Sequence, residues 1–188
     1  MRFCLGISVY TAAAVAAICA APSHSASAQD ADAKPVSIDV LDVASMTVPA
    51  TFKKTQPRSR IIQHEFKVGE GEKPARLTFM AAGGGVTPNI KRWKGQFSGG
   101  DPDEQKTETM EVGKFEVHLV DVSGSYSESM GGGPFAPGKR VQRENYAMAG
   151  AILVAPNQRL YFANLIGPAK IVKANREKFV EMIKTVGK

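Results

Sequence analysis

A chain of 188 residues, 43% of them hydrophobic and 22% charged, is long enough to bury one core, so a single globular domain is the natural expectation. Its two cysteines, Cys4 and Cys19, stand close to the N-terminus. Because the rest of the chain has no cysteine, it cannot contain a zinc site held by cysteines, a cysteine nucleophile or a redox-active cysteine pair. The formal net charge of +6 favours acidic partners.

The N-terminal segment has the layout of a secretory signal peptide. One cation, Arg2, precedes an uncharged apolar run over residues 3–21, and residues 26–28 read Ala-Ser-Ala, a pattern typical of a cleavage site. We expect residues 1–28 to be removed and the mature chain to start at Gln29, in the periplasm or outside the cell. The alternative is a membrane anchor, since the run approaches the roughly 20 residues that span a bilayer. After cleavage we expect no membrane span.

The positive net charge indicates which kinds of partner an exported chain would bind. Outside the cytoplasm it suits an anionic polysaccharide, lipid headgroups or an acidic protein better than nucleic acid. We expect an unknown protein or an anionic polymer as partner, with no nucleic acid and no nucleotide. The alternative is that the charge only keeps the protein soluble.

The first predicted elements follow a short leader. Residues 29–44 are polar and contain a proline, so we expect a disordered leader there and a single ordered domain over 45–188. Order should begin near Met46, in a strand that Pro49 confines to a sheet edge or terminates. Residues 60–68 alternate in polarity, which predicts a half-buried strand with Glu65 on its wet face.

A second strand and a helix follow. Residues 76–82 are apolar on both sides before a run of glycines. Thr87 and Pro88 suit the N-cap and the first position of a helix. Trp93 lies on the apolar stripe of that helix, and we expect it in the core rather than at a ligand site.

The second half of the chain predicts more strands. Residues 106–112 and 115–126 indicate a hairpin, and the glycine- and proline-rich residues 127–144 are expected to form a long loop. Strands at 145–155 and 159–167 are apolar on both faces and need cover from both sides. A helix from about residue 169 to 186 supplies it. This order predicts an α+β fold, with a mostly antiparallel sheet of about six or seven strands and helices packed on it.

Two short patterns resemble the PsbP-like fold group of exported, mostly uncharacterised bacterial domains. The first is "VPATFKK", Val48 to Lys54, and the second is "YFANLIGPAKIVKANREKFVEMIKTV", in which a strand runs through Gly167 into the closing helix. The resemblance implies an α/β/α sandwich whose known members mostly bind partners or assist assembly without catalysing a reaction. It carries over no catalytic residue.

The stretch "GPFAPGKR", residues 133–140, is similar to a phosphate-binding loop. Such a loop needs Ser or Thr after the lysine, where this chain has Arg140, and Pro134 and Pro137 lack N–H donors. We therefore expect no nucleotide site. The segment is instead the best candidate for partner binding through Phe135, Lys139, Arg140 and Arg143, the alternative being simple disorder.

The remaining titratable residues indicate no catalytic, cofactor or metal site. His64 and His118 lie outside any metal-ligand spacing, and both are expected as hydrogen-bonded border histidines. Asp121 interrupts an apolar face, and we expect it to pair with an arginine. The sequence does not say whether Asp121, His64 and His118 meet in space.

Three functions follow from these observations. The first is an exported, non-enzymatic binding or accessory domain. The second is a small periplasmic hydrolase built around Asp121 and a histidine. The third is an envelope structural protein that binds acidic polymers through its charge.

Overall fold

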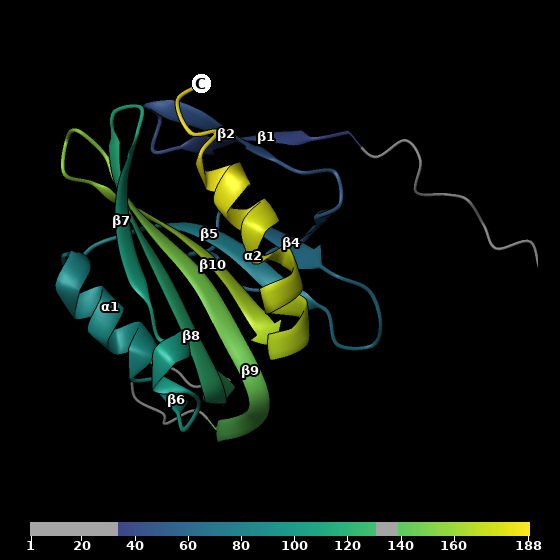
Figure 1. Cartoon of the computed structure of the whole chain (residues 1–188). Helices are drawn as coiled ribbons and strands as arrows, with labels where there is room; N and C mark the ends of the chain where they lie inside the picture. The colour runs from purple at the N-terminus through teal and green to yellow at the C-terminus, as the bar shows by residue number, and fades with distance from the viewer. Residues whose placement is uncertain (1–33, 131–138) are drawn as a thin grey trace, which may run out of the picture. The chain divides into compact units, whose positions relative to one another are not determined.

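The computed structural model of the protein describes residues 34–130 and 139–188. Within these residues the fold is α+β, and all strand pairings are antiparallel (Figure 1). The strands are β1 (Val36–Val40), β2 (Ala44–Val48), β3 (Lys53–Thr55), β4 (His64–Val68), β5 (Ala75–Ala82), β6 (Phe97–Ser98), β7 (Thr107–Val112), β8 (Phe115–Met130), β9 (Lys139–Val154) and β10 (Leu160–Pro168). The helices are α1 (Val86–Lys94), α2 (Ala169–Ile183) and a short 3-10 helix, η1 (Pro102–Glu104).

The main sheet contains eight of these strands. Seven follow the order β3-β4-β5-β10-β9-β8-β6, and β7 pairs with β8. The predicted α+β class and antiparallel pairing are confirmed, but the expected six or seven strands are too few. Strands β3 and β6 are only three and two residues long, too short to produce a recognisable alternation.

Strand β1 lies within residues 29–44, where we expected a disordered leader, and that expectation is wrong for this part. Residues 36–48 form a hairpin of β1 and β2, a separate two-stranded sheet. Ile38 and Val40 of β1 are buried. Tyr161 of β10 donates its hydroxyl to the carbonyl oxygen of Asp39 (3.2 Å), which ties β1 to the main sheet. The alternating apolar residues of β1 form a strand because the core of the domain buries their side chains.

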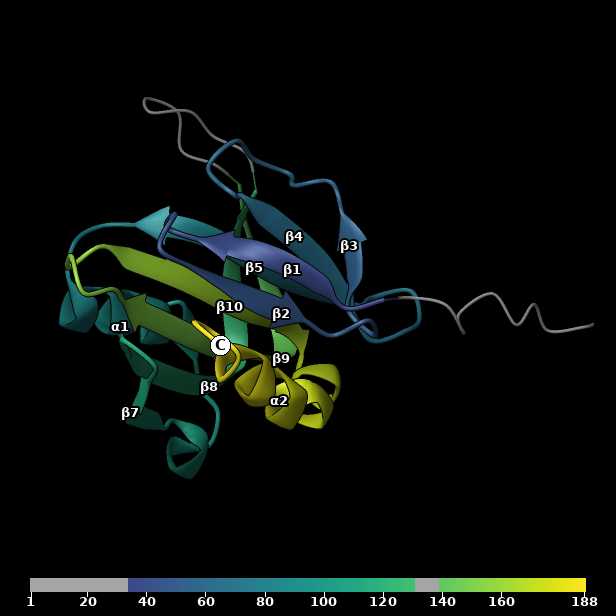
Figure 2. The same ribbon diagram turned by 90° about the horizontal axis from the view of Figure 1, so that it is seen from above.

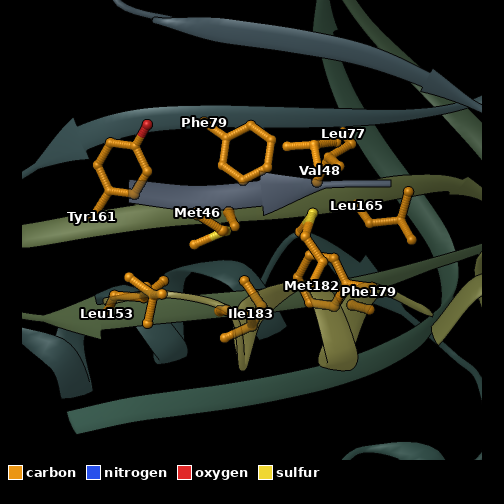
Figure 3. Close-up of a cluster of buried hydrophobic side chains, with 14 of the residues drawn as sticks. Met46, Val48, Leu77, Phe79, Leu153, Tyr161, Leu165, Phe179, Met182 and Ile183 are labelled. Carbon is orange, nitrogen blue, oxygen red and sulfur yellow. The ribbon is translucent and has the colours of Figure 1, made fainter. Parts of the chain in front are cut away.

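One face of the main sheet carries the larger core, beneath α2 and the β1–β2 hairpin. Figure 2 shows the hairpin beside α2 over this face. Figure 3 shows side chains of α2 pointing toward those of β2 and the sheet: Phe179, Met182 and Ile183 approach Met46 and Val48. The predicted closing helix is confirmed, and it ends at Ile183, ahead of the buried Val186.

The opposite face is covered by α1 over part of its area. Trp93 of α1 is 3% exposed and meets Phe162 edge to face at 4.9 Å, so its predicted place in the core is confirmed. The helix begins at Val86, with Gly85 as N-cap and no capping side chain, so the predicted cap at Thr87 is wrong. Instead, Asn89 donates its amide to the carbonyl oxygens of Gly83 and Gly85 (2.9 and 2.6 Å).

Strands β8 and β9 run far into the segment that we expected to be a loop. Strand β8 reaches Met130 and β9 starts at Lys139, so residues 127–130 and 139–144 are strand where we expected a loop. The register shifts between Gly124 and Tyr126, a β-bulge. Cross-strand contacts offset the poor strand propensity here: Glu128 on β8 and Arg143 on β9 form an ion pair at 3.0 Å.

Some sequence predictions lie outside the described residues. These are the signal peptide, residues 1–28, and the tip of the glycine-rich segment, residues 131–138, which includes Phe135. Within residues 34–130 and 139–188, no helix combines the length and the apolar character needed to cross a bilayer.

Candidate functional site

Asp121 lies in an ion pair with α2, as its sequence context predicts. Both of its carboxylate oxygens accept hydrogen bonds from Arg176, at 2.7 to 2.9 Å. The hydrogen bonds to Asp121, opposed by burial, raise the pKa of Arg176 above its ordinary value. This bidentate ion pair links α2 to β8.

The two histidines lie elsewhere. On β8, His118 shares a face with Val120 and Val122, which pack in the α1 core, whereas Asp121 lies on the α2 face. The ring of His118 lies 3.0 Å from the Thr109 hydroxyl through Nδ1 and 3.1 Å from Glu116 through Nε2. His118 is therefore the hydrogen-bonded border histidine that we predicted.

His64 lies on β4 opposite Phe79 of β5. Burial, and then the charge of Lys54, lower its pKa below the ordinary value. The hollow beside Asp121 is lined by neither histidine, so the structure does not bring Asp121 together with a histidine, as the hydrolase hypothesis requires. Among the described residues, no group of three or more His, Cys, Asp or Glu side chains is placed to hold a metal ion.

The hollow beside Asp121 is lined by ion pairs. Lys173 of α2 donates to Glu104 of η1 at 2.5 Å, and the Ser123 hydroxyl donates to the same carboxylate at 2.7 Å. These hydrogen bonds, with that of Lys173 the largest influence, lower the pKa of Glu104. These polar groups fasten α2 and η1 to β8.

A second hollow lies on the face that α1 covers only in part, and we call it the arginine hollow. It measures about 340 Å³. Its charged lining residues are Arg58, Lys67, Lys73, Arg76, Arg143, Glu65, Glu72 and Glu128. Five of these are basic and three acidic, so the hollow has a net positive charge and attracts anions.

Glu65 organises one side of the arginine hollow. It is 3% exposed, although the alternation of β4 predicts a wet position. Arg76 of β5 donates Nε and Nη2 to its two oxygens (2.7 and 2.9 Å), and the backbone N–H of Arg58 donates to Oε2 (2.9 Å). Burial alone would raise the pKa of Glu65, but the bonds and charges of Arg76 and Arg58 together lower it. Glu65 is buried because these partners lie over it, a tertiary contact that alternation does not report.

Tyrosines and Arg143 line the other side. Tyr126 of β8 and Tyr146 of β9 stack at 6.1 Å with 8° between their planes. Burial raises the pKa of Tyr126, so its hydroxyl remains protonated at neutral pH. Arg143 holds Glu128 through Nε. Sequence reasoning missed both tyrosines, since strand alternation alone does not show which faces remain uncovered.

The predicted partner-binding residues are therefore separated by the fold. Arg143 lines the arginine hollow. Arg140 is exposed on β9, opposite Ser129, and lines none of the hollows named here. Lys139 begins β9, and its side chain, like Phe135, lies outside the described residues. Of the four, Arg143 alone is placed by the described structure in a concave site.

A third hollow adjoins the arginine hollow and shares Arg76, Tyr126 and Ile166 with it. It lies between α1 and the strands β5 and β10, and we call it the α1 hollow. It measures about 250 Å³.

The fold and these hollows define an α+β domain with a basic concave surface on one face of its sheet. Comparison with models of known protein families finds no match, and comparison with curated proteins finds none. The functional proposal therefore rests on the geometry and charge of this surface.

Proposed function

We propose that the protein is an exported, non-enzymatic binding domain of PsbP-like fold that holds an acidic partner, a protein or an anionic polymer, in its arginine hollow. The observation that carries the proposal is the gathering of five cations around a concave surface that α1 leaves open. Export rests on the signal peptide predicted over residues 1–28. The PsbP-like fold rests on the two sequence patterns at either end of the domain.

The charges of the hollow are partly held in place by its own acids. Glu65 fixes the guanidinium group of Arg76, and Glu128 fixes that of Arg143. Pre-positioned guanidinium groups lose little entropy when an incoming carboxylate or sulfate binds. Lys67 and Lys73 are exposed and form no ion pair with any described residue, so they remain available to neutralise a longer anion.

The proposal is tested with two variants that each lose two positive charges, one inside the arginine hollow and one on another surface. The hollow variant is Lys67→Gln with Lys73→Gln, and the matched control is Lys91→Gln with Lys170→Gln, two exposed lysines outside the hollow. Binding of the mature protein to polygalacturonate and to poly-L-glutamate is measured by calorimetry at low and high salt.

We expect the hollow variant to bind one of these polymers about fivefold more weakly, from roughly 0.5 kcal/mol for each lost charge, and the control to bind as the wild type does. If both variants lose affinity equally, the charge acts diffusely, as expected for an envelope structural protein, and the arginine hollow is not the site. Binding of neither polymer by the wild type also contradicts the proposal.

A further inference from the structure

We infer that the α1 hollow is a separate site for a small organic anion that has an apolar ring body and one N–H or O–H donor. This inference does not rest on the proposed function, because its ligand is a small molecule and its decisive residues, Asn164 and Arg92, do not line the arginine hollow.

The first observation is an acceptor without a donor. Oδ1 of Asn164 on β10 is buried, and no described residue donates a hydrogen bond to it. Such a group is costly in a folded protein and is usually paired. Asn164 lines the α1 hollow, and its Oδ1 lies close to the ring of Trp93. A bound ligand that shifts this ring slightly would expose Oδ1 and donate a hydrogen bond to it.

The two neighbouring strands give Oδ1 of Asn164 no partner, and Thr78 of β5, which lies opposite Asn164 on one side, does not donate to it. Gly150 of β9 lies directly opposite Asn164. A Cβ atom at Gly150 would stand 3.2 Å from Oδ1 of Asn164 and 2.7 Å from Cζ3 of Trp93. Any side chain at this position would push Trp93 away, so the space is kept for the indole ring and the hollow beside it.

The second observation is the charge of the lining. Arg76 and Arg92 line the α1 hollow, and no Asp or Glu is among its described lining residues. Arg92 forms no ion pair with any described residue. Arg76 uses Nε and Nη2 on Glu65, which leaves Nη1 as a donor. The hollow therefore suits an anion.

The third observation is the size and polarity of the remaining wall. The apolar part consists of Met80, Met148, Phe162, Ile166 and the ring of Trp93. A volume of about 250 Å³ lies below the roughly 300 Å³ at which pockets for drug-sized ligands begin. The occupant is thus a molecule of at most about three rings rather than a polymer segment.

Three probes separate these features. 1-Anilinonaphthalene-8-sulfonate has a ring body, an anion and an N–H donor; N-phenyl-1-naphthylamine lacks the anion, and naphthalene-1-sulfonate lacks the donor. Their affinities are measured by calorimetry on the full chain. Trp93 is the single tryptophan and lines the hollow, so quenching of its fluorescence by the first two probes reports the location of binding.

Two variants remove one feature each. Asn164→Leu has the same shape without the acceptor and should weaken both N–H probes about fivefold, leaving naphthalene-1-sulfonate unchanged. Arg92→Gln should weaken both sulfonates about fivefold and leave the neutral amine unchanged. Lys91→Gln, on the same helix but outside the hollow, is the matched control, and thermal unfolding confirms that each variant is folded.

The expected result is that the first probe binds most tightly, quenches Trp93 and responds to both variants. The inference is overturned if Asn164→Leu does not weaken the two N–H probes or if Arg92→Gln does not weaken the two sulfonates. It is equally overturned if Lys91→Gln weakens binding as much, or if the fluorescence of Trp93 is not quenched. It is also overturned if the neutral amine binds as tightly as 1-anilinonaphthalene-8-sulfonate. Because Lys67 and Lys73 do not line this hollow, failure here leaves the result for the acidic polymers unaffected.

Discussion

Replacement of Gly150 by alanine tests how the α1 face is packed. The new Cβ atom would lie 2.7 Å from Cζ3 and 3.0 Å from Cε3 of Trp93. Carbon atoms are best separated by about 3.5–4.0 Å, so the indole would have to retreat by roughly 0.8 Å or more. Trp93 is almost fully buried against Phe162, which leaves the ring little room to move.

The expected cost follows from two opposing effects. Overpacking of a filled core costs about 1–3 kcal/mol, while replacing glycine by alanine restricts the unfolded chain and returns about 0.4–1 kcal/mol. We expect Gly150→Ala to lower the free energy of unfolding by about 1–2 kcal/mol. For a domain of this size the melting temperature should fall by roughly 2–8 °C.

Urea and thermal unfolding, followed by far-UV circular dichroism, provide the assay. Gly83→Ala is the matched control, because a Cβ atom there meets nothing within 4 Å and Gly83 has no positive φ. The double variant Gly150→Ala with Trp93→Phe should be more stable than the two single effects predict, by about 1 kcal/mol, since the smaller ring relieves the clash. The reasoning is refuted if Gly150→Ala is as stable as the wild type, or if the two effects simply add.

Two further predictions concern pH. Glu65→Gln should lower the free energy of unfolding by about 1–3 kcal/mol at pH 7, because Arg76 loses a charged partner. Since folding lowers the pKa of Glu65 below its ordinary value of 4.5, its contribution is present above that pH and lost as the pH falls through the lower folded value. Urea unfolding between pH 7 and 3 should show this loss in the wild type and a flatter curve in the variant; identical curves would contradict the assignment. For His64, the folded pKa lies below the ordinary 6.5, so stability is fully present above pH 6.5 and declines as the pH falls through the folded value. His64→Gln should remove this part of the slope between pH 8 and 5, and an unchanged slope would show that another group titrates.

Local patterns in the sequence determined most of the secondary structure. The both-face apolar runs of β9 and β10, the hairpin turn at Gly113 and the stripe of α2 are properties of neighbouring residues, so periodicity predicts them. The pairing of Asp121 with an arginine was also predictable. A carboxylate on an otherwise apolar strand face needs a cation to remain charged.

Only the tertiary structure decided the rest. Strand β1 alternates in polarity but is only five residues long, and the extensions of β8 and β9 are too polar to be recognised alone. They are strands because partner strands and a core are present. The arginine hollow joins Arg58, Glu65, Arg76 and Arg143 from separate parts of the chain, and its charge comes from their proximity. The unpaired oxygen of Asn164 is likewise a tertiary feature, since it is buried near Gly150 and Trp93 without a donor. Burial and pairing are relations between distant residues, and no local pattern contains them.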